Sequence, residues 1–509
     1  MLLRFLTGKG KQNKNDSNLQ LKNSQDDVLS ADLTQNTEKL PQLFSQAPDL
    51  VIRRFKIAGN KTDAALVYLK GLTDKDAIQN YVLKPLIQSC FDHNMELPIT
   101  IGEVETVHSW SQIQDAILGG DSILLVNGQI SAYQLATKGW PQREINDPQN
   151  EISLKGAHQG FVETGSKNIA LIRRYIPHQE LLLKEMKVGI RGKSKVSILY
   201  LRDVASEEVL KELETRIQEI QVDAIINTGE LIEFIEDNPF SPFPQFILTE
   251  RPDSVASQIL QGRFAIVLDG SPSVLIAPTN FMSFFQGIDD YGTRWLVASF
   301  IRLLRFMALM IALFLPATYV AFISFNFEVI PMKLLLSIAE SRIQVPLSPM
   351  MEALLMEITL ELMREAALRL PAPIGQTIGI VGGIIIGQAA VQAGIVSNIM
   401  IIVVAITAIA SYNIPNYDMS SSIRLLRFPM MLLASFFGVI GIVVGGMTLV
   451  AHIISLESLG TPYGSPLAPF RIADMKDAFM RFPLWVMKRR PHGTGVNGLI
   501  RQGRNRTKR

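Results

Sequence analysis

The stretch LPAPIGQTIGIVGGIIIGQAAVQAGIVSNIMIIVVAITAIASYNIPNY (370–417) contains no Asp, Glu, Lys or Arg. One membrane-spanning helix needs about 20 apolar residues, so this run is long enough for two crossings. We therefore predict two short transmembrane helices here, over about 374–394 and 396–412. This part of the chain is expected to lie in lipid.

Two further apolar segments lie on either side of this pair. One spans about 305–327 and follows Arg302 and Arg305, and the other spans about 429–454. Basic residues mark the cytoplasmic ends of membrane helices, so we expect the preceding domain to lie in the cytoplasm. The sequence thus predicts an α-helical transmembrane domain over 294–456 with about four spans.

The number of spans depends on how the segment 348–370 is interpreted. Residues 471–509 hold eleven Lys or Arg and two Asp, and four spans place this basic tail on the cytoplasmic side. Arg424 and Arg427 would then lie outside, against the same rule. Counting 348–370 as a fifth span would bring these two arginines inside but would put the tail outside. We therefore prefer four spans over five.

The segment SPMMEALLMEITLELMREAALRL (348–370) predicts an amphipathic helix, because Glu357, Glu361 and Glu365 recur every four residues on one side. Two interpretations fit this acidic side. In one, the carboxylates are repeated around an oligomer and line a cation vestibule. In the other, they form a solvated face whose charge is balanced by arginines three or four residues further along.

Glycines within GQTIGIVGGIIIGQAAVQAG (375–394) recur every four residues and form one narrow groove, where another helix can pack closely. The predicted packing glycines are Gly375, Gly379, Gly383 and Gly387, together with Gly441 and Gly445 of the last span. Gln388 and Gln392 fall on roughly the opposite side. A polar side chain in lipid needs a partner or water, so the two glutamines predict either a lumen or an interhelical hydrogen bond.

The first 293 residues carry most of the charge and predict a soluble α/β domain. A strand, a helix and a hairpin follow one another over 64–136, and the same order recurs over 196–278. The hairpins turn at Asn127-Gly128 and Asp269-Gly270. We interpret the recurrence as an internal duplication. The alternative is two unrelated α/β pieces with similar turns. The two similar subdomains are predicted over 41–145 and 146–293.

A proline-rich segment, NPFSPFPQF (238–246), interrupts the second subdomain. Its prolines exclude a helix or a central strand, so it is expected to form an ordered loop. The loop is either a rigid connector or a docking site for a partner. The candidate docking residues are Pro239, Pro242, Phe243 and Pro244.

The two ends of the chain and its composition set further limits. Residues 1–40 are polar and poor in large apolar side chains, so we expect a disordered lead. Residues 457–509 are expected to form a basic cytoplasmic tail. The net charge of the whole chain is only +2, which predicts no nucleic-acid partner. Cys90 is the single cysteine, which excludes an intrachain disulfide.

Motifs of catalysis and cofactor binding are missing from the sequence. GIRGKSK (189–195) resembles a phosphate loop, but Lys187 stands where the first glycine of that motif is required. The six histidines lack metal-binding spacing, and there is no GxSxG signature. We therefore predict no enzymatic activity, no cofactor and no metal site.

Several long motifs, in the same order, give the chain a family resemblance. They are SPFPQ (241–245), TERPD (249–253), GRFAIVLDGSPSVLIAPT (262–279), REAALRLPAPIGQTIGIVGGIIIGQAAVQAGIVS (364–397) and SLGTPYGSPLAP (458–469). With these motifs the chain resembles the A subunit of the GerA-type spore germinant receptors, over roughly residues 60–470. One departure is Ala367, where the family often has glycine.

The resemblance implies a multi-pass protein of the inner spore membrane whose soluble domain and tail are cytoplasmic. It implies two partners, a transporter-like B subunit that senses the nutrient and a lipoprotein C subunit. It also implies that the A subunit forms a homo-oligomer and releases ions when germination begins. The glycine-rich hairpin and the acidic helix are then the candidates for the conducting assembly.

Three functions remain in competition at this point. The first is an oligomeric ion channel gated through the nutrient-sensing partner, which acts by a population shift between closed and open helix packings. The second is a non-conducting scaffold subunit of the same complex. The third is a membrane transporter or flippase, for which four spans give little room for inverted repeats.

Overall fold

The soluble half of the protein is built on two antiparallel five-stranded sheets. This computed structural model describes residues 28–58, 62–88, 98–139, 158–371, 383 and 387–503. The first sheet has the order β1-β2-β4-β5-β3 and the second has the order β6-β7-β9-β10-β8. The strands are β1 (Leu50–Lys56), β2 (Asp63–Leu69), β3 (Val104–Val107), β4 (Ser122–Val126), β5 (Ala132–Leu135), β6 (Leu181–Val188), β7 (Ser194–Leu201), β8 (Ile247–Thr249), β9 (Phe264–Leu268) and β10 (Val274–Ala277).

The sequence explains why these strands form. β4 (SILLV) and β9 (FAIVL) lie at the centre of their sheets, and all five residues of each are buried. Each is followed by the predicted tight turn, in which Gly128 and Gly270 have φ of 86° and 95°. Such positive φ values suit glycine because it has no Cβ. The predicted hairpins are therefore present, β4 with β5 and β9 with β10.

Helices cover both sheets. Those of the first sheet are α1 (Leu33–Leu43), the short α2 (Lys75–Ala77), η1 (Ile78–Leu83) and α3 (Lys84–Gln88), and α4 (Trp110–Leu118). Those of the second are α5 (Gly165–Tyr175), α6 (Glu207–Glu219), α7 (Thr228–Ile235) and α8 (Pro252–Ile259). A buried ion pair joins the two units, because Arg173 Nε donates to Asp49 Oδ2 at 2.7 Å.

The predicted disordered lead reaches too far along the chain. From Val28 onward the chain is folded, and α1 occupies part of the segment 1–40. Leu29, Leu33 and Leu40 are buried in the first core, which offsets the entropy of ordering this polar segment. The expected subdomain boundary at 145/146 and the single cysteine lie outside the described residues.

In each unit, a similar pair of hydrogen bonds joins the first helix to the segment before it. Asn36 accepts from the backbone N–H of Ser30 at 3.0 Å and donates to the carbonyl oxygen of Ser30 at 2.6 Å. Asn168 makes the same two bonds with Val162, at 2.9 and 2.6 Å. Each asparagine lies on the first helix of its unit and binds the residue six positions before it.

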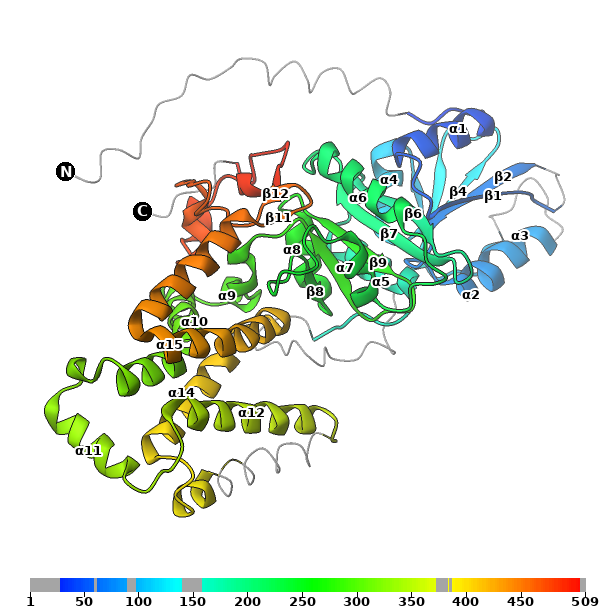
Figure 1. Cartoon of the computed structure of the whole chain (residues 1–509). Helices are drawn as coiled ribbons and strands as arrows, with labels where there is room; N and C mark the ends of the chain where they lie inside the picture. The colour runs from blue at the N-terminus through cyan, green and yellow to red at the C-terminus, as the bar shows by residue number, and fades with distance from the viewer. Residues whose placement is uncertain are drawn as a thin grey trace, which may run out of the picture.

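The second half of the chain is helical. Its helices are α10 (Trp295–Ser324), α11 (Met332–Arg342), α12 (Pro349–Leu368), α14 (Asn398–Tyr412) and α15 (Tyr417–Ser455), preceded by the short α9 (Asp289–Gly292). α12 matches the predicted amphipathic helix within two residues. α11 was not expected from the sequence. Figure 1 shows the second sheet between the first sheet and this group of helices.

Two helices, α10 and α15, are long and apolar enough to cross a membrane. A core helix of a soluble protein would be mostly buried, but only 50% and 33% of their most apolar windows are buried. Large apolar side chains cover their outer faces, among them Phe300, Met307, Met310, Phe436, Phe437, Ile440, Val444 and Met447. Since exposed apolar area of this extent is unfavourable in water, the surface supports association with a membrane.

The predicted spans differ from the helices in detail. α10 begins ten residues before the predicted start of its span, so Arg302 and Arg305 lie inside the helix. α14 has only 15 residues, fewer than a full crossing needs. The predicted span 374–394 lies mostly outside the described residues.

The last helix, α15, is not one straight span as we expected over 429–454. It begins earlier, at Tyr417, and bends at Gly438, where φ is 59° and ψ is −138°. Its two parts run in different directions on either side of the bend (Figure 1). Asn326 lies at the bend and accepts from the backbone N–H of Val439 at 3.3 Å. Only glycine adopts this conformation readily, which explains why the helix breaks here.

The chain after α15 returns to the soluble half. Ser458 Oγ donates to the carbonyl oxygen of Gln245 at 2.8 Å, and the Asn497 N–H donates to that of Val204 at 2.9 Å. Residues 457–503 therefore pack against the second unit. Its short elements are β11 (Glu457–Ser458), β12 (Thr461–Pro462), η4 (Asp474–Asp477), η5 (Leu484–Val486) and η6 (His492–Thr494).

The tail also binds the beginning of α10. Arg302 is fully buried, and its Nη1 donates to Asp477 Oδ1 at 2.7 Å while its Nε donates to Asp290 Oδ2 at 2.8 Å. Tyr291 donates to the other carboxylate oxygen of Asp477 at 2.6 Å, and burial raises the pKa of Tyr291. The entry into the helical half and the exit from it therefore lie together.

Candidate functional site

Buried ion pairs gather where α10, α12 and α15 meet. Glu357 of α12 and Arg427 of α15 form a hydrogen-bonded pair, and their side chains are 0% and 1% exposed. Arg427 Nε also donates to the carbonyl oxygen of Ala312 in α10, at 2.9 Å. A charge is costly to bury unless it is paired and hydrogen-bonded. The arginine and the glutamate thus hold three helices in one arrangement.

A second buried pair links α11 to α12. Arg342 Nη1 donates to Glu352 Oε2 and to Tyr319 Oη, the latter at 3.0 Å. The backbone N–H and the hydroxyl of Ser397 both donate to Glu352 Oε1. Ser397 is the N-cap of α14 and Tyr319 lies on α10, so the carboxylate of Glu352 joins four helices. Satisfied networks of this kind specify a single packing.

A third cluster is partly open to its surroundings. Glu361 Oε1 lies 3.5 Å from Arg364 Nη1 and 3.3 Å from Arg424 Nε. Arg364 Nη2 donates to Ser411 Oγ at 3.3 Å, and Arg424 Nη1 donates to Ser420 Oγ at 3.2 Å. Two arginines share one glutamate here, so the cluster carries an excess of positive charge.

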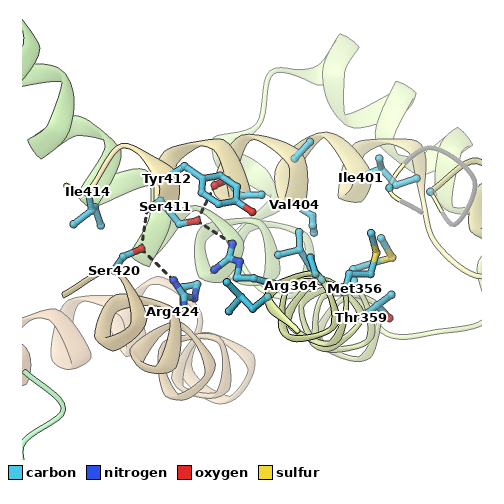
Figure 2. A pocket seen from close by; sticks show the side chains of 18 of the residues that line it. Met356, Thr359, Arg364, Ile401, Val404, Ser411, Tyr412, Ile414, Ser420 and Arg424 are labelled. Carbon is cyan, nitrogen blue, oxygen red and sulfur yellow. Dashed lines mark hydrogen bonds between the residues drawn. The ribbon is translucent and has the colours of Figure 1, made fainter. Parts of the chain in front are cut away.

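This third cluster forms one end of a cavity between α12, α14 and the start of α15. The cavity has a volume of about 880 Å³, within the range of small-molecule sites. Figure 2 shows Arg364 and Arg424 beside the serines at one end, and Met356 and Ile401 at the other. The cavity therefore has a polar, basic end and an apolar wall, which together suit an amphiphilic group with an anionic or polar head.

The three predicted vestibule residues do not share one environment. Glu357 is buried against Arg427, Glu361 is 30% exposed and Glu365 is 59% exposed. The expected pairs with arginines three or four residues further along α12 are present, Glu361 with Arg364 and Glu365 with Arg369. Of the two interpretations of the acidic side, the solvated face does not hold for Glu357, because Arg427 of another helix covers it.

The predicted glycines and glutamines lie in different places. Gly375 and Gly379 are outside the described residues, and Gly383 and Gly387 line the cavity. Gln388 and Gln392 are exposed. In the second part of α15, a Cβ at Gly445 would lie 2.6 Å from Met430 Sδ, and one at Gly441 would lie 2.1 Å from the carbonyl oxygen of Leu433. These two glycines allow the parts of α15 to approach each other across the bend.

The proline-rich loop contacts the C-terminal end of α15. Phe243 is buried, with ring centroids 6.1 Å from Phe281 and 6.0 Å from His452. The hydroxyl of Tyr463 donates to the carbonyl oxygen of Pro244 at 2.8 Å. Within the chain the loop is thus a connector between the second sheet and the end of α15. Pro239 is exposed and Pro242 is half-buried, so part of the loop's surface is open.

Sequence reasoning missed the basic partners and one of the buried carboxylates. The missed residues are Tyr319, Arg342, Glu352, Ser397 and Arg427. One signal could have found part of this set. Arg424 and Arg427 disagreed with the expected membrane orientation, and a charge in an apolar segment requires a buried partner. The acidic helix was the nearest source of such partners.

Within the described ranges, no group of three or more His, Cys, Asp or Glu side chains could hold a metal ion. The polar clusters are instead ion pairs and hydrogen bonds between helices.

The chain matches a family model, several known proteins and a solved structure. The family model described as "Bacillus/Clostridium GerA spore germination protein" matches residues 38–493. The chain is 40% identical to "Uncharacterized membrane protein YfkQ" of Bacillus subtilis (strain 168), covering 96% of this chain and 98% of that protein. It is 39% identical to "Spore germination protein KA" of the same organism, covering 94% of this chain and 89% of the relative.

Further matches include a protein of another species and a solved structure. The chain is 38% identical to "Spore germination protein GerLA" of Bacillus cereus, over 91% of this chain and 96% of that protein. The crystal structure of the N-terminal domain of the A subunit of the Bacillus megaterium spore germinant receptor GerK3 is 32% identical, with a TM-score of 0.40. The match covers 50% of this chain and 97% of that one.

Proposed function

The chain belongs to the GerA family of spore germination proteins, and from that premise we propose that it is the membrane subunit of a nutrient receptor that triggers germination. In this proposal several copies of the chain form an ion channel. A nutrient-sensing partner subunit controls whether the channel is open.

The observation that carries the proposal is the exposure of Gln388 and Gln392. Both belong to the charge-free run 370–417, and both are exposed on a single copy of the chain. The lipid interior offers no hydrogen-bond partners, so exposed amide side chains within a membrane require water or a polar neighbour. A second copy of the chain, with a water-filled path between the copies, would supply both. Glu361 and Glu365 would then lie at the entrance to that path.

The Glu357–Arg427 pair supports a mechanism for gating. It joins α12 to α15, and through Ala312 it also joins them to α10. Packed helices of this kind switch between discrete arrangements rather than deforming continuously. We infer that the present packing is the closed one and that nutrient binding to the partner favours a packing in which this pair is broken.

Orientation and partners follow from the same proposal. The soluble units and the tail are on one side of the membrane, which the Arg302–Asp477 contact supports, and that side is the cytoplasm. The membrane is the inner membrane of the spore. The partners are a transporter-like B subunit and a lipoprotein C subunit, and lipids contact the apolar faces of α10 and α15.

The two soluble units are proposed to derive from an internal duplication. Three features support it: the same strand order, the same positive-φ glycine in the hairpin, and the same asparagine arrangement at the entry. A repeated unit would present two similar surfaces to partner subunits.

A scaffold subunit that does not conduct is the second candidate. Its supporting observation is that Glu352 and Glu357 are both neutralised and buried within one chain. If all the charge in the helical half served packing alone, the soluble units would gather partners and the helices would only anchor them.

The two candidates are separated by cation efflux from liposomes that hold the purified chain, alone and with its partners. Conduction that is lowered by Gln388→Leu/Gln392→Leu supports the channel with these glutamines in its path. The control is Gln218→Leu, an exposed glutamine of the soluble half. No efflux from the intact chain in either setting would leave the scaffold as the function.

A further inference from the structure

A second cavity lies where the tail crosses the second soluble unit. It has a volume of about 280 Å³ and is lined by residues of 261–286 and 465–501. At about 30 Å³ for each water, this is room for roughly nine water molecules. The cavity is smaller than the range of about 300–1,000 Å³ that is typical of drug-sized ligands, so a small solute fits it better.

The wall of this cavity contains a buried arginine whose hydrogen-bonding capacity is mostly unused. Arg263, just before β9, is only 2% exposed. Its Nη2 donates to Ser283 Oγ at 2.6 Å, whereas Nε and Nη1 have no hydrogen-bond partner among the described residues. Burial lowers the pKa of the guanidinium to about 10. A buried cation without a counter-ion is unfavourable, so the site has a reason to bind an anion.

The other charged residues around the cavity also favour an anion. Besides Arg263, four basic residues line it, and all four come from the tail: Lys476, Lys488, Arg489 and Arg501. Two acidic residues also line it, but both are engaged. Asp477 accepts from Arg302 and Tyr291, and Asp474 accepts from the backbone N–H of His492 at 3.0 Å. The cavity therefore has an excess of positive charge.

The cavity wall also contains a neutral hydrogen-bond donor, the hydroxyl of Ser465. Ser465 is 1% exposed, lines the cavity, and its hydroxyl has no hydrogen-bond partner among the residues described. Nη2 of Arg263 keeps a second N–H group parallel to that of Nε or of Nη1, so the guanidinium can still donate to two oxygens of one anion, and the Ser465 hydroxyl can donate to a third. Phosphate, with its several equivalent oxygens, satisfies this arrangement more completely than a halide ion does.

We propose that the cavity between the second soluble unit and the tail binds a phosphate group, with Arg263 as its principal ligand. The phosphate is either free in the cytoplasm or part of a lipid headgroup, because Asp477 of the cavity wall binds the first turns of α10 near the membrane. The bound anion would fix the tail on the soluble unit. It would thereby stabilise the joint between the beginning of α10 and the end of α15.

The test measures thermal unfolding of the purified full chain in detergent, in sodium phosphate and in sodium chloride of equal ionic strength. A ligand that binds only the folded state raises the unfolding temperature. Phosphate is expected to raise it for the intact chain and for the control Arg191→Gln, whose exposed side chain pairs with Asp223. It is not expected to raise it for Arg263→Gln. In chloride, Arg263→Gln is expected to unfold at the same or a higher temperature than the intact chain, because the unpaired buried charge is gone.

Two further arms keep the proposal falsifiable. Arg263→Lys retains the charge but not the two parallel N–H groups, and should weaken phosphate binding by about tenfold or more in a titration. This variant gives the answer if Arg263→Gln does not fold. Nanodiscs that contain the anionic phospholipid phosphatidic acid, whose phosphate is terminal, are compared with nanodiscs of phosphatidylcholine alone, whose phosphate carries choline, to identify a lipid source. Stabilisation by the anionic lipid that requires Arg263 and is absent with free phosphate supports the headgroup.

Two results would overturn the proposal. One is that neither free phosphate nor the anionic lipid stabilises the intact chain. The other is equal stabilisation of the intact chain and of Arg263→Gln or Arg263→Lys. These measurements need no ion conduction, so their failure leaves the proposed channel untouched.

Discussion

Glu357 and Arg427 are 70 residues apart in sequence, yet they form an ion pair in which both side chains are buried. Removing one partner leaves a buried charge alone, which costs about 3–5 kcal/mol. We expect Glu357→Ala to lower the unfolding temperature of the detergent-solubilised protein strongly. The double variant Glu357→Gln/Arg427→Met should recover much of the loss. If the double variant is less stable than the single one, the pair is not what holds α12 against α15.

The bend in α15 depends on one glycine. A Cβ at Gly438 would lie 2.8 Å from Asn326 Oδ1, and the backbone there has a conformation that costs other residues about 1–3 kcal/mol. Gly438→Ala should therefore lower the unfolding temperature. Gly446→Ala is the matched control, because its Cβ would lie 3.6 Å from the Phe314 ring, an ordinary contact. Equal effects of the two substitutions would argue against the bend.

The stability of the protein should depend on pH through one carboxyl group of the second soluble unit. Burial, with the nearby charges of Glu233 and Asp237, raises the pKa of Glu236 from 4.5 to about 6. The folded protein thus binds this proton more tightly than the unfolded chain does. The resulting stabilisation is complete below about pH 4.5 and is lost as the pH rises through 6.

Unfolding temperatures measured from pH 4 to pH 7 test this dependence. Glu236→Gln should remove part of the decrease in stability that the intact chain shows over this interval. Glu219→Gln, at an exposed glutamate of α6, should keep it. The size of the effect is reduced by solvent screening, because the Glu236 side chain is only partly buried. Identical pH profiles for all three proteins would refute the assignment.

Asn36 and Asn168 should contribute equally to stability if the soluble units are repeats. Asn36→Ala and Asn168→Ala each leave a backbone N–H and a carbonyl oxygen without their side-chain partner. Each loss is expected to cost about 1–3 kcal/mol for every group left buried. Urea unfolding of the two variants should give losses of similar size. A loss confined to one unit would indicate that the resemblance between the units is only geometric.

Local patterns in the sequence predicted the local structure. The glycine turns after β4 and β9 and the extent of α12 follow from residues next to one another in the chain, so the sequence alone was sufficient. α11 was missed because its sequence, MKLLLSIAESR, is only weakly amphipathic. The bend at Gly438 was missed because a glycine in an apolar run resembles any other packing glycine.

The site was less accessible from sequence, for a physical reason. The spacing of Glu357, Glu361 and Glu365 says that they share one side of a helix, but not what lies opposite that side. Arg427 approaches Glu357 from a helix that begins 60 residues later, and only the fold brings the two together. The tail is a second example, since its composition predicts a basic segment but not that Arg481 donates to the carbonyl oxygen of Asp290 and Arg490 to that of Leu260.

The most direct measurement of the proposed gate is nutrient-evoked cation efflux from liposomes that hold the complete receptor. Three versions of this chain are compared: the intact chain, Arg427→Gln, and the exchanged pair Glu357→Arg/Arg427→Glu. We expect efflux from the intact receptor only after a nutrient mixture is added, efflux without nutrient from Arg427→Gln, and restored nutrient dependence in the exchanged pair. No efflux from the intact receptor, or the same nutrient dependence in all three, would contradict the proposed gate.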